Sequence, residues 1–130
     1  MAEGLKDKVV LITGASQGIG AAMARRFACA GAHVYVNFAH NAKNADGVVE
    51  DIRAAGGSAE AFQCDISDET QVKERFGKLP TIDVLINNAR LDPFSRGEIS
   101  DGEWFTKTLG VKLVGAYMAT LAVVEGMKKQ

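Results

Sequence analysis

Three glycines near the start of the chain, Gly14, Gly18 and Gly20, have the spacing of a phosphate-binding turn. Val9–Thr13 before them is a short aliphatic run that predicts a buried strand, and the small side chains of Ala21–Ala30 after them favour a helix packed closely on a sheet. In such a junction the first glycine permits the tight turn, the second lets the backbone approach a pyrophosphate, and the third lets the helix pack on the strand. The exposed N–H groups and the helix dipole then attract phosphate. We therefore predict a dinucleotide-binding turn; the alternative is a merely flexible turn.

The two cysteines of the chain indicate neither a metal site nor a disulfide framework. Cys29 and Cys64 are separated by 35 positions, and no Cys-x-x-Cys motif is present. We therefore expect two reduced thiols, no bound metal and a cytoplasmic location.

Composition and charge favour a single soluble domain that spans residues 1–130. The 130 residues are 47% apolar and 24% charged, and 15 basic against 16 acidic residues give a net charge of −1. A sequence pI of 6.1 lacks the basic excess typical of nucleic-acid binding, so we expect neither a nucleic-acid partner nor an anionic membrane surface. The apolar run Val9–Ile12 is too short for a signal-peptide core. The uncharged stretch Leu113–Val124 is shorter than the roughly 20 residues of a membrane span, so we expect a buried helix there.

Short β-branched runs alternate with segments of helical period along the chain, which predicts βαβ units around a parallel sheet. After the glycines we expect a helix to begin at Ser67, and a capping box of Ser100 and Glu103 to begin a long final helix. Right-handed crossovers with the glycines after strand one give the strand order 3-2-1-4, a Rossmann-like doubly wound α/β sheet. The remaining expected elements are strand His33–Phe38, helix Ala42–Ala55, strand Ala59–Cys64 and strand Ile82–Ile86.

The spacing Gly-x-x-x-Gly-x-Gly, one residue longer than the usual G-x-G-x-x-G opening, resembles the short-chain dehydrogenase/reductase family. Cys64-Asp65-Ile66 looks like the family's Asp-hydrophobic pair after strand three, which implies that the Asp65 carboxylate receives the adenine amino group. Asn87-Asn88-Ala89 looks like its Asn-Asn-Ala-Gly motif, and the resemblance extends from Leu5 to Lys128. The cofactor-binding residues we predict are Gly14, Ser16, Gln17, Gly18, Ile19, Gly20, Asn37, His40, Asp65, Ile66, Asn88 and Ala89.

The residue type at the end of the second strand indicates which dinucleotide, NAD or NADP, we expect. An acidic residue there would accept hydrogen bonds from the adenosine ribose of NAD, but this chain has Phe38. Because no carboxylate stands there, a 2′-phosphate would not be repelled. His40 and Lys43 could supply hydrogen-bond donors or positive charge to that phosphate, and Asn37 and Ser16 could add hydrogen bonds. Gln17 stands where related NADP-dependent proteins often carry a basic residue. We therefore expect NADP in preference to NAD; the alternative for His40 and Lys43 is a solvated helix start.

The resemblance does not extend to the residues that carry out the family's reaction. The family transfers a hydride between nicotinamide and a carbonyl or alcohol with a serine, a Tyr-x-x-x-Lys pair and an asparagine, and all but the asparagine would lie beyond Gln130. Arg90 replaces the last glycine of the Asn-Asn-Ala-Gly motif, and Lys112 replaces the helix asparagine. We therefore assign no catalytic residue and expect no turnover by the isolated chain. Two functions stay open: part of an oxidoreductase, or a non-catalytic cofactor-binding or interaction module, which Arg90 and Lys112 favour.

A sheet that ends at strand four leaves that strand as an unpaired edge and exposes apolar surface, which we expect to be covered. Between Thr108 and Val124 only Lys112 is charged, so the final helix is apolar on nearly every face. In the resembling family this helix commonly pairs with its copy in another subunit. We expect a homo-oligomer or a completing partner chain at this helix and the strand-four edge; the alternative is a helix folded back over its own sheet edge.

Overall fold

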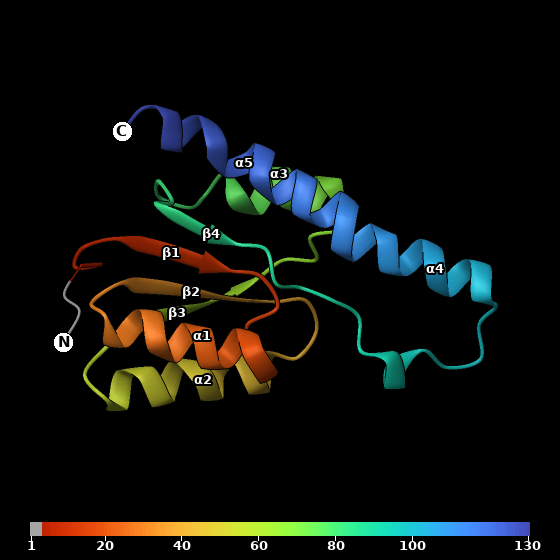
Figure 1. Ribbon diagram of the computed structural model, residues 1–130, viewed down its shortest axis with the longest axis horizontal. Coiled ribbons are helices and arrows are strands. Elements are labelled where there is room, and N and C mark those ends of the chain that lie inside the picture. The colour runs from red at the N-terminus through yellow and green to blue at the C-terminus, as the bar shows by residue number, and fades with distance from the viewer. Residues whose placement is uncertain (1–3) are drawn as a thin grey trace.

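The computed structural model describes residues 4–130 and arranges them as an alternating series of strands and helices (Figure 1). The chain begins with strand β1, followed by helix α1 after the glycine-rich turn, and it ends in a long helical run. The elements in chain order are β1 (Val9–Ile12), α1 (Gly18–Cys29), β2 (His33–Phe38), α2 (Ala42–Ala54), β3 (Ser58–Gln63), α3 (Glu69–Phe76), β4 (Val84–Ile86), a 3-10 turn (Pro93–Ser95), α4 (Asp101–Leu109), a π-helical turn (Gly110–Gly115) and α5 (Ala116–Lys128).

The four strands form one parallel sheet in the order β3-β2-β1-β4, as the sequence predicted. Val10 in β1 pairs with Val34 in β2 and Val84 in β4, which fixes the register of the centre of the sheet. Helices α1 and α2 lie on one side of the sheet, and α3 and α5 lie on the other (Figure 1). The chain therefore has the three-layer, doubly wound α/β architecture that we expected.

Alternate residues of the strands fill two separate cores because side chains along a strand point to opposite faces. Val10 and Ile12 of β1 pack in the core beneath α1 and α2. Leu11, between them, packs in the other core, with Phe76 of α3 and Val123 of α5. Both cores hold the carboxyl ends of the strands in place, and these ends carry the glycine-rich turn.

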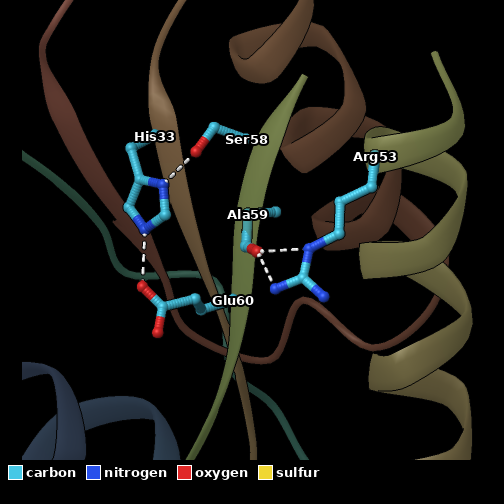
Figure 2. Close-up of polar contacts among 5 residues, drawn as sticks. All are labelled: His33, Arg53, Ser58, Ala59 and Glu60. Carbon is cyan, nitrogen blue, oxygen red and sulfur yellow. Dashed lines mark hydrogen bonds and ion pairs between the residues drawn. The ribbon is translucent and has the colours of Figure 1, made fainter. Parts of the chain in front are cut away.

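The outer edge of β3 is partly blocked by a side chain from α2. The Arg53 guanidinium donates two hydrogen bonds to the carbonyl oxygen of Ala59, at 3.2 Å from Nε and 2.9 Å from Nη2 (Figure 2). On the sheet face beside it, the His33 imidazole lies between the Ser58 hydroxyl and the Glu60 carboxylate, with 2.9 Å between Nε2 and Oε2. These contacts pin β3 to β2 and occupy a carbonyl that would otherwise be available to another strand.

Several element boundaries differ from the sequence predictions. Helix α1 begins at Gly18, three residues before the predicted start at Ala21, so two of the glycines lie within its first turn. The predicted cap of α3 was Ser67, but Asp68 is the N-cap, and its carboxylate accepts a hydrogen bond from the Gln71 N–H at 3.2 Å. The reason is local: Ser67 instead donates its hydroxyl proton to Asp65, at 2.6 Å.

The final helix begins as predicted and then departs from the expected burial. The Ser100 hydroxyl accepts a hydrogen bond from the Glu103 N–H at 3.2 Å, which confirms Ser100 as the N-cap. The helix is buried on one face only, however, because the face with Gly115, Ala119 and Val123 is the one that lies against the sheet. Nothing in residues 4–130 covers the opposite face, which exposes Phe105, Leu109, Leu113, Val114, Tyr117 and Leu121.

The helical run Asp101–Lys128 is also long and apolar enough to cross a membrane by length and composition alone. It contains 28 residues, its most apolar 18-residue window has a mean hydropathy of 1.4, and 17% of that window is buried. The continuous run is longer than the uncharged stretch considered from the sequence. A single helix that meets this criterion is weak evidence for a membrane span.

Candidate dinucleotide-binding site

The glycine-rich turn is packed so tightly that two of its glycines cannot carry a side chain. A Cβ atom on Gly14 would lie 2.7 Å from the Cα of Ala89, and Gly14 also has a φ of +63°. A Cβ atom on Gly20 would lie 2.5 Å from both the Asn88 Nδ2 and the Gly14 carbonyl oxygen. These contacts confirm the sequence argument that one glycine permits the turn and another permits close packing of helix on strand.

Gly18 differs from these two glycines because the space in front of it is open. Its φ is +58°, yet an added Cβ atom would meet nothing within 4 Å. A left-handed backbone with open space before it is what a ligand needs in order to approach the main chain closely. The structure thus leaves room at the position where the sequence predicted contact with a pyrophosphate.

The N-terminus of α1 provides unpaired backbone donors at this opening. The N-cap residue Gln17 makes no side-chain capping bond, and the first turn of α1 contains no acidic residue. Within residues 4–130 the first N–H group of α1 with a backbone acceptor is that of Ala21, which donates to the Gln17 carbonyl at 3.2 Å. The preceding N–H groups and the helix dipole therefore suit an anion. Of the other predicted residues of the turn, Ile19 is 75% exposed and Ser16 is half-buried.

Thr13, at the end of β1, joins this turn to the segment that follows β4. Its side chain is completely buried, and its hydroxyl oxygen accepts hydrogen bonds from the N–H groups of Asn88, at 2.9 Å, and Ala89, at 3.0 Å. The Asn88 side chain donates in return to the carbonyl oxygens of Thr13 and Gly14, both at 3.1 Å. The predicted residues Asn88 and Ala89 therefore border the glycine-rich turn, and the Asn88 amide group positions it.

Asn37 has a different role from the one we predicted. The residue is 2% exposed, so its side chain does not reach the surface. Its Oδ1 accepts a hydrogen bond from the Gly14 N–H at 3.1 Å, and its Nδ2 donates to the carbonyls of Phe62 and Cys64, each at 3.1 Å. All these side-chain atoms are occupied, so Asn37 positions the turn from β2 in place of contacting the ligand directly.

The segment after β3 places one carboxylate oxygen of Asp65 toward the protein and leaves the other without a partner in the described chain. Oδ1 accepts hydrogen bonds from the Ser67 N–H, at 3.0 Å, and from its hydroxyl, at 2.6 Å. This pair holds the half-buried carboxylate in one orientation. The neighbouring Ile66 side chain is 4% exposed and packs in the core, so only its backbone could contact a ligand.

The loop between β2 and α2 and the first turn of α2 carry a lysine and polar groups and no carboxylate. His40 and Lys43 are exposed, and the first turn of α2 contains no acidic residue. Asn41 caps α2 by accepting from the Asn44 N–H at 3.0 Å, and the Asn44 amide donates to Gln17 Oε1 at 3.5 Å. The sequence analysis missed Asn41 and Asn44, although an asparagine before a helical segment is a common capping signal.

The only large pKa shift at the edge of the site belongs to a thiol. Burial raises the pKa of Cys64 to about 11, with the Arg75 guanidinium opposing this rise and the carboxylates of Asp65 and Asp68 adding to it. A thiol with so high a pKa stays protonated at neutral pH and is a poor nucleophile. The structure thus agrees with a structural role for Cys64.

A parallel doubly wound sheet with a glycine-rich turn after β1, followed by helix N–H groups without partners in the described chain, defines the class of Rossmann-type dinucleotide-binding domains. The family model that matches the chain, over residues 8–130, is described as short chain dehydrogenase. The chain belongs to this family.

Individual relatives agree with the family assignment. An uncharacterized oxidoreductase of Methylorubrum extorquens is 42% identical over 125 residues, which cover 91% of this chain and 49% of that protein. An L-rhamnose 1-dehydrogenase (NAD(P)(+)) of Azotobacter vinelandii is 38% identical over 133 residues, covering 97% of this chain and 52% of that protein. A short-chain dehydrogenase/reductase variant from Serratia marcescens, whose structure is solved, superposes with a TM-score of 0.81 at 28% identity, covering 95% of this chain and 52% of that one. The chain thus spans about half the length of these proteins.

Proposed function

We propose that this chain is the NADP(H)-binding part of a short-chain oxidoreductase. The observation that carries the proposal is the open N-terminus of α1 behind Gly18, where backbone donors without partners in the described chain meet open space. A pyrophosphate supplies the negative charge that such a helix end attracts.

The residues around the turn hold the cofactor from three sides in this proposal. Backbone N–H groups from Gly18 onward donate to the pyrophosphate, and the oriented Asp65 carboxylate accepts from the adenine amino group, as the family resemblance implies. His40 and Lys43 are exposed, and in this proposal His40 supplies a hydrogen-bond donor and Lys43 a positive charge to the 2′-phosphate. No carboxylate in the first turn of α2 opposes that phosphate, so we infer NADP in preference to NAD.

The bound dinucleotide would supply hydride transfer to or from a carbonyl or alcohol, which is the chemistry the family resemblance implies. Because the chain spans about half of its relatives, we assign none of its residues to the proton transfer that accompanies the hydride. The exposed apolar face of the final helix and the outer edge of β4 offer the surface on which a second copy or a completing chain would pack. A cytoplasmic location agrees with the free thiols of Cys29 and Cys64.

A second function, a non-catalytic NADP(H)-binding module, is favoured by one specific observation. Arg90 and Lys112 stand at positions where the resembling family carries glycine and asparagine, and both side chains are exposed. An ammonium has donors but no acceptor, so Lys112 cannot copy the hydrogen bonding of an asparagine. Both functions require the same cofactor, and they differ in whether a complete enzyme turns over.

Titration of the purified chain with NADPH and with NADH tests the shared part of the proposal. We expect nicotinamide fluorescence to change on binding and the melting temperature to rise, with NADPH bound more tightly. Replacing His40 and Lys43 together by glutamine should weaken NADPH binding about 2- to 30-fold, since exposed contacts to a charged group contribute roughly 0.2–1 kcal/mol each.

NADH binding should change little in that variant, and Lys78→Gln, in the turn after α3, is the matched control for charge alone. Absence of binding by either cofactor to a folded chain would overturn the proposal. Equal loss of NADPH and NADH affinity in the double variant would overturn the assignment of the 2′-phosphate to His40 and Lys43.

A further inference from the structure

Three side chains at the amino ends of β2 and β3 form a hydrogen-bonded series on one face of the sheet (Figure 2). His33 and Ser58 are the first residues of their strands, and they are paired in the register of the sheet. Glu60 lies two residues after Ser58, so its side chain projects from the same face. The glycine-rich turn follows the carboxyl end of β1, so this cluster lies at the other end of the parallel sheet from the candidate dinucleotide site.

The partners of the His33 imidazole determine which of its nitrogens carries the proton. Its Nε2 lies 2.9 Å from Glu60 Oε2, and an ionised carboxylate only accepts hydrogen bonds. In the neutral ring the proton is therefore on Nε2, and Nδ1 carries a lone pair. Nδ1 contacts the Ser58 hydroxyl, which must then be the donor. The series thus runs from the Ser58 O–H group to the imidazole, and from the imidazole N–H group to the carboxylate.

This order of groups is the one that activates a hydroxyl as a nucleophile. A serine hydroxyl is weakly nucleophilic until an adjacent base takes its proton, and a third group commonly orients that base. Ser58 and Glu60 are exposed and the His33 side chain is 29% exposed, so a substrate and water reach the series. Among the ion pairs of residues 4–130, Glu60 takes part in the one with His33 alone, which leaves its carboxylate to the imidazole.

Aromatic rings border the series and indicate which substrates it accepts. The Tyr35 ring lies edge-on to the His33 ring with 5.0 Å between centroids, and the Phe62 ring lies edge-on to Tyr35 at 6.3 Å. Burial raises the pKa of the Tyr35 hydroxyl, and the Glu60 carboxylate raises it further, so Tyr35 is uncharged at neutral pH. Rings favour contact with another aromatic group, and the carboxylate repels anions. These surroundings therefore suit a neutral aromatic ligand.

We propose that Ser58, His33 and Glu60 form a second site that hydrolyses neutral aryl esters, with Ser58 as the nucleophile, His33 as the general base and Glu60 as the residue that positions His33. The Ser58 Oγ forms a bond to the ester carbonyl carbon while its proton passes to His33 Nδ1. The bond between that carbon and the aryl oxygen then breaks, and the proton on Nδ1 leaves with the phenol. Water attacks the acyl group next, giving a proton to Nδ1 that returns to Ser58 Oγ. One ester and one water thus give one phenol and one carboxylic acid.

Covalent labelling of the full chain tests the proposal without any variant. Diethyl p-nitrophenyl phosphate is a neutral aryl ester that leaves a stable phosphoryl group on an activated serine, and peptide mass mapping identifies the serine that carries it. We expect Ser58 to be labelled at least about 100-fold faster than Ser95 at pH 8, since a positioned general base contributes about 10²- to 10⁴-fold. Ser95 is the matched internal control because it is exposed and its hydroxyl donates at 2.7 Å to the Asp92 carbonyl oxygen, which is not a base.

Two variants separate the base from the residue that positions it. His33→Ala should lower the labelling of Ser58 to the rate of Ser95, and imidazole added to the solution should restore part of the rate, which the loss of a merely structural histidine would not allow. Glu60→Gln should lower the rate at least about 10-fold. Its own readout is nitrogen-15 NMR of the His33 ring, where the wild type should hold the proton on Nε2 and the variant should show both tautomers.

Steady hydrolysis of p-nitrophenyl acetate measures the complete reaction, and it should be lost in Ser58→Ala and kept in Ser95→Ala. Equal labelling of Ser58 and Ser95 in the wild type overturns the proposal, because it would show that His33 does not activate Ser58. Hydrolysis that survives in Ser58→Ala overturns the hydrolytic function. A His33 ring with its proton on Nδ1 in the wild type overturns the direction of the series and the role of Glu60.

Discussion

Replacing Thr13 by valine should destabilise the chain far more than the loss of one surface hydroxyl would. Thr13 is fully buried, and its hydroxyl oxygen accepts from the N–H groups of Asn88 at 2.9 Å and Ala89 at 3.0 Å. Valine has nearly the same shape and fills the same space, but it accepts no hydrogen bond. Leaving a buried donor unpaired costs about 1–3 kcal/mol, so two such donors cost about 2–6 kcal/mol.

The matched control is Thr13→Ser, which keeps the hydroxyl and loses one methyl group, at a cost of about 1 kcal/mol. Urea unfolding measures the free energy of unfolding of both variants, and valine should cost at least about 1 kcal/mol more than serine. In thermal unfolding, the valine variant should melt about 8–24 °C below the wild type, at roughly 4 °C per kcal/mol for a domain of this size.

A valine variant within about 0.5 kcal/mol of the serine variant would refute the reasoning, because it would show that the two N–H groups lose nothing when the hydroxyl is removed. Hydrogen exchange provides a second measurement in case the valine variant does not fold. The amides of Asn88 and Ala89 should exchange slowly in the wild type and in Thr13→Ser, and rapid exchange of both in the wild type would equally contradict the hydrogen bonds.

Three further predictions concern other residues of the same region. Gly14→Ala should destabilise by about 3 kcal/mol or more, whereas Gly97→Ala, at a similar φ of +67° but with nothing within 4 Å, should cost only about 1–2 kcal/mol; equal melting temperatures would show that contact with the Ala89 backbone is unimportant. Asn37→Asp should cost about 3 kcal/mol in urea unfolding because it buries a charge and removes both donors from Nδ2, and a loss below about 1 kcal/mol would contradict this role. The pKa of Cys64 is raised to about 11, so the folded state holds its proton more tightly than the unfolded state, and stability from this group should be present below pH 9 and lost as the pH rises toward 11. Thiol titration at pH 8 should accordingly modify the exposed Cys29 first and Cys64 only on unfolding, and rapid reaction of both thiols would exclude the burial of Cys64.

Patterns of residues close together in the sequence were sufficient to predict much of this fold. The apolar strands and the helix signals between them predicted the strand order β3-β2-β1-β4, and the spacing of Gly14, Gly18 and Gly20 located the tightly packed turn between β1 and α1. These features depend on residues close together in the chain, or on the handedness of crossovers, which is the same in nearly all proteins.

Side-chain roles that depend on distant partners could not be predicted in the same way. Asn37 looked like a ligand contact because it lies near the end of a strand, but its hydrogen-bond partners are 23 to 27 positions away. The partners of Thr13 are 75 and 76 positions away. For Ser67 and Asp68, adjacent residues of equally good capping types, the choice was decided by the Asp65 carboxylate that takes the Ser67 hydroxyl.

The two edges of the sheet differ, and the difference limits how sheets from separate molecules can join. The Ala59 carbonyl on the β3 edge is occupied by Arg53, whereas no strand within residues 4–130 pairs with the outer side of β4. Open-ended growth of a fibril requires two complementary edges on every molecule, so that each added copy offers a new site for the next. With its Ala59 carbonyl occupied, β3 is the less accessible of the two edges. The guanidinium there works against open-ended growth, so contact through β4 favours closed pairs.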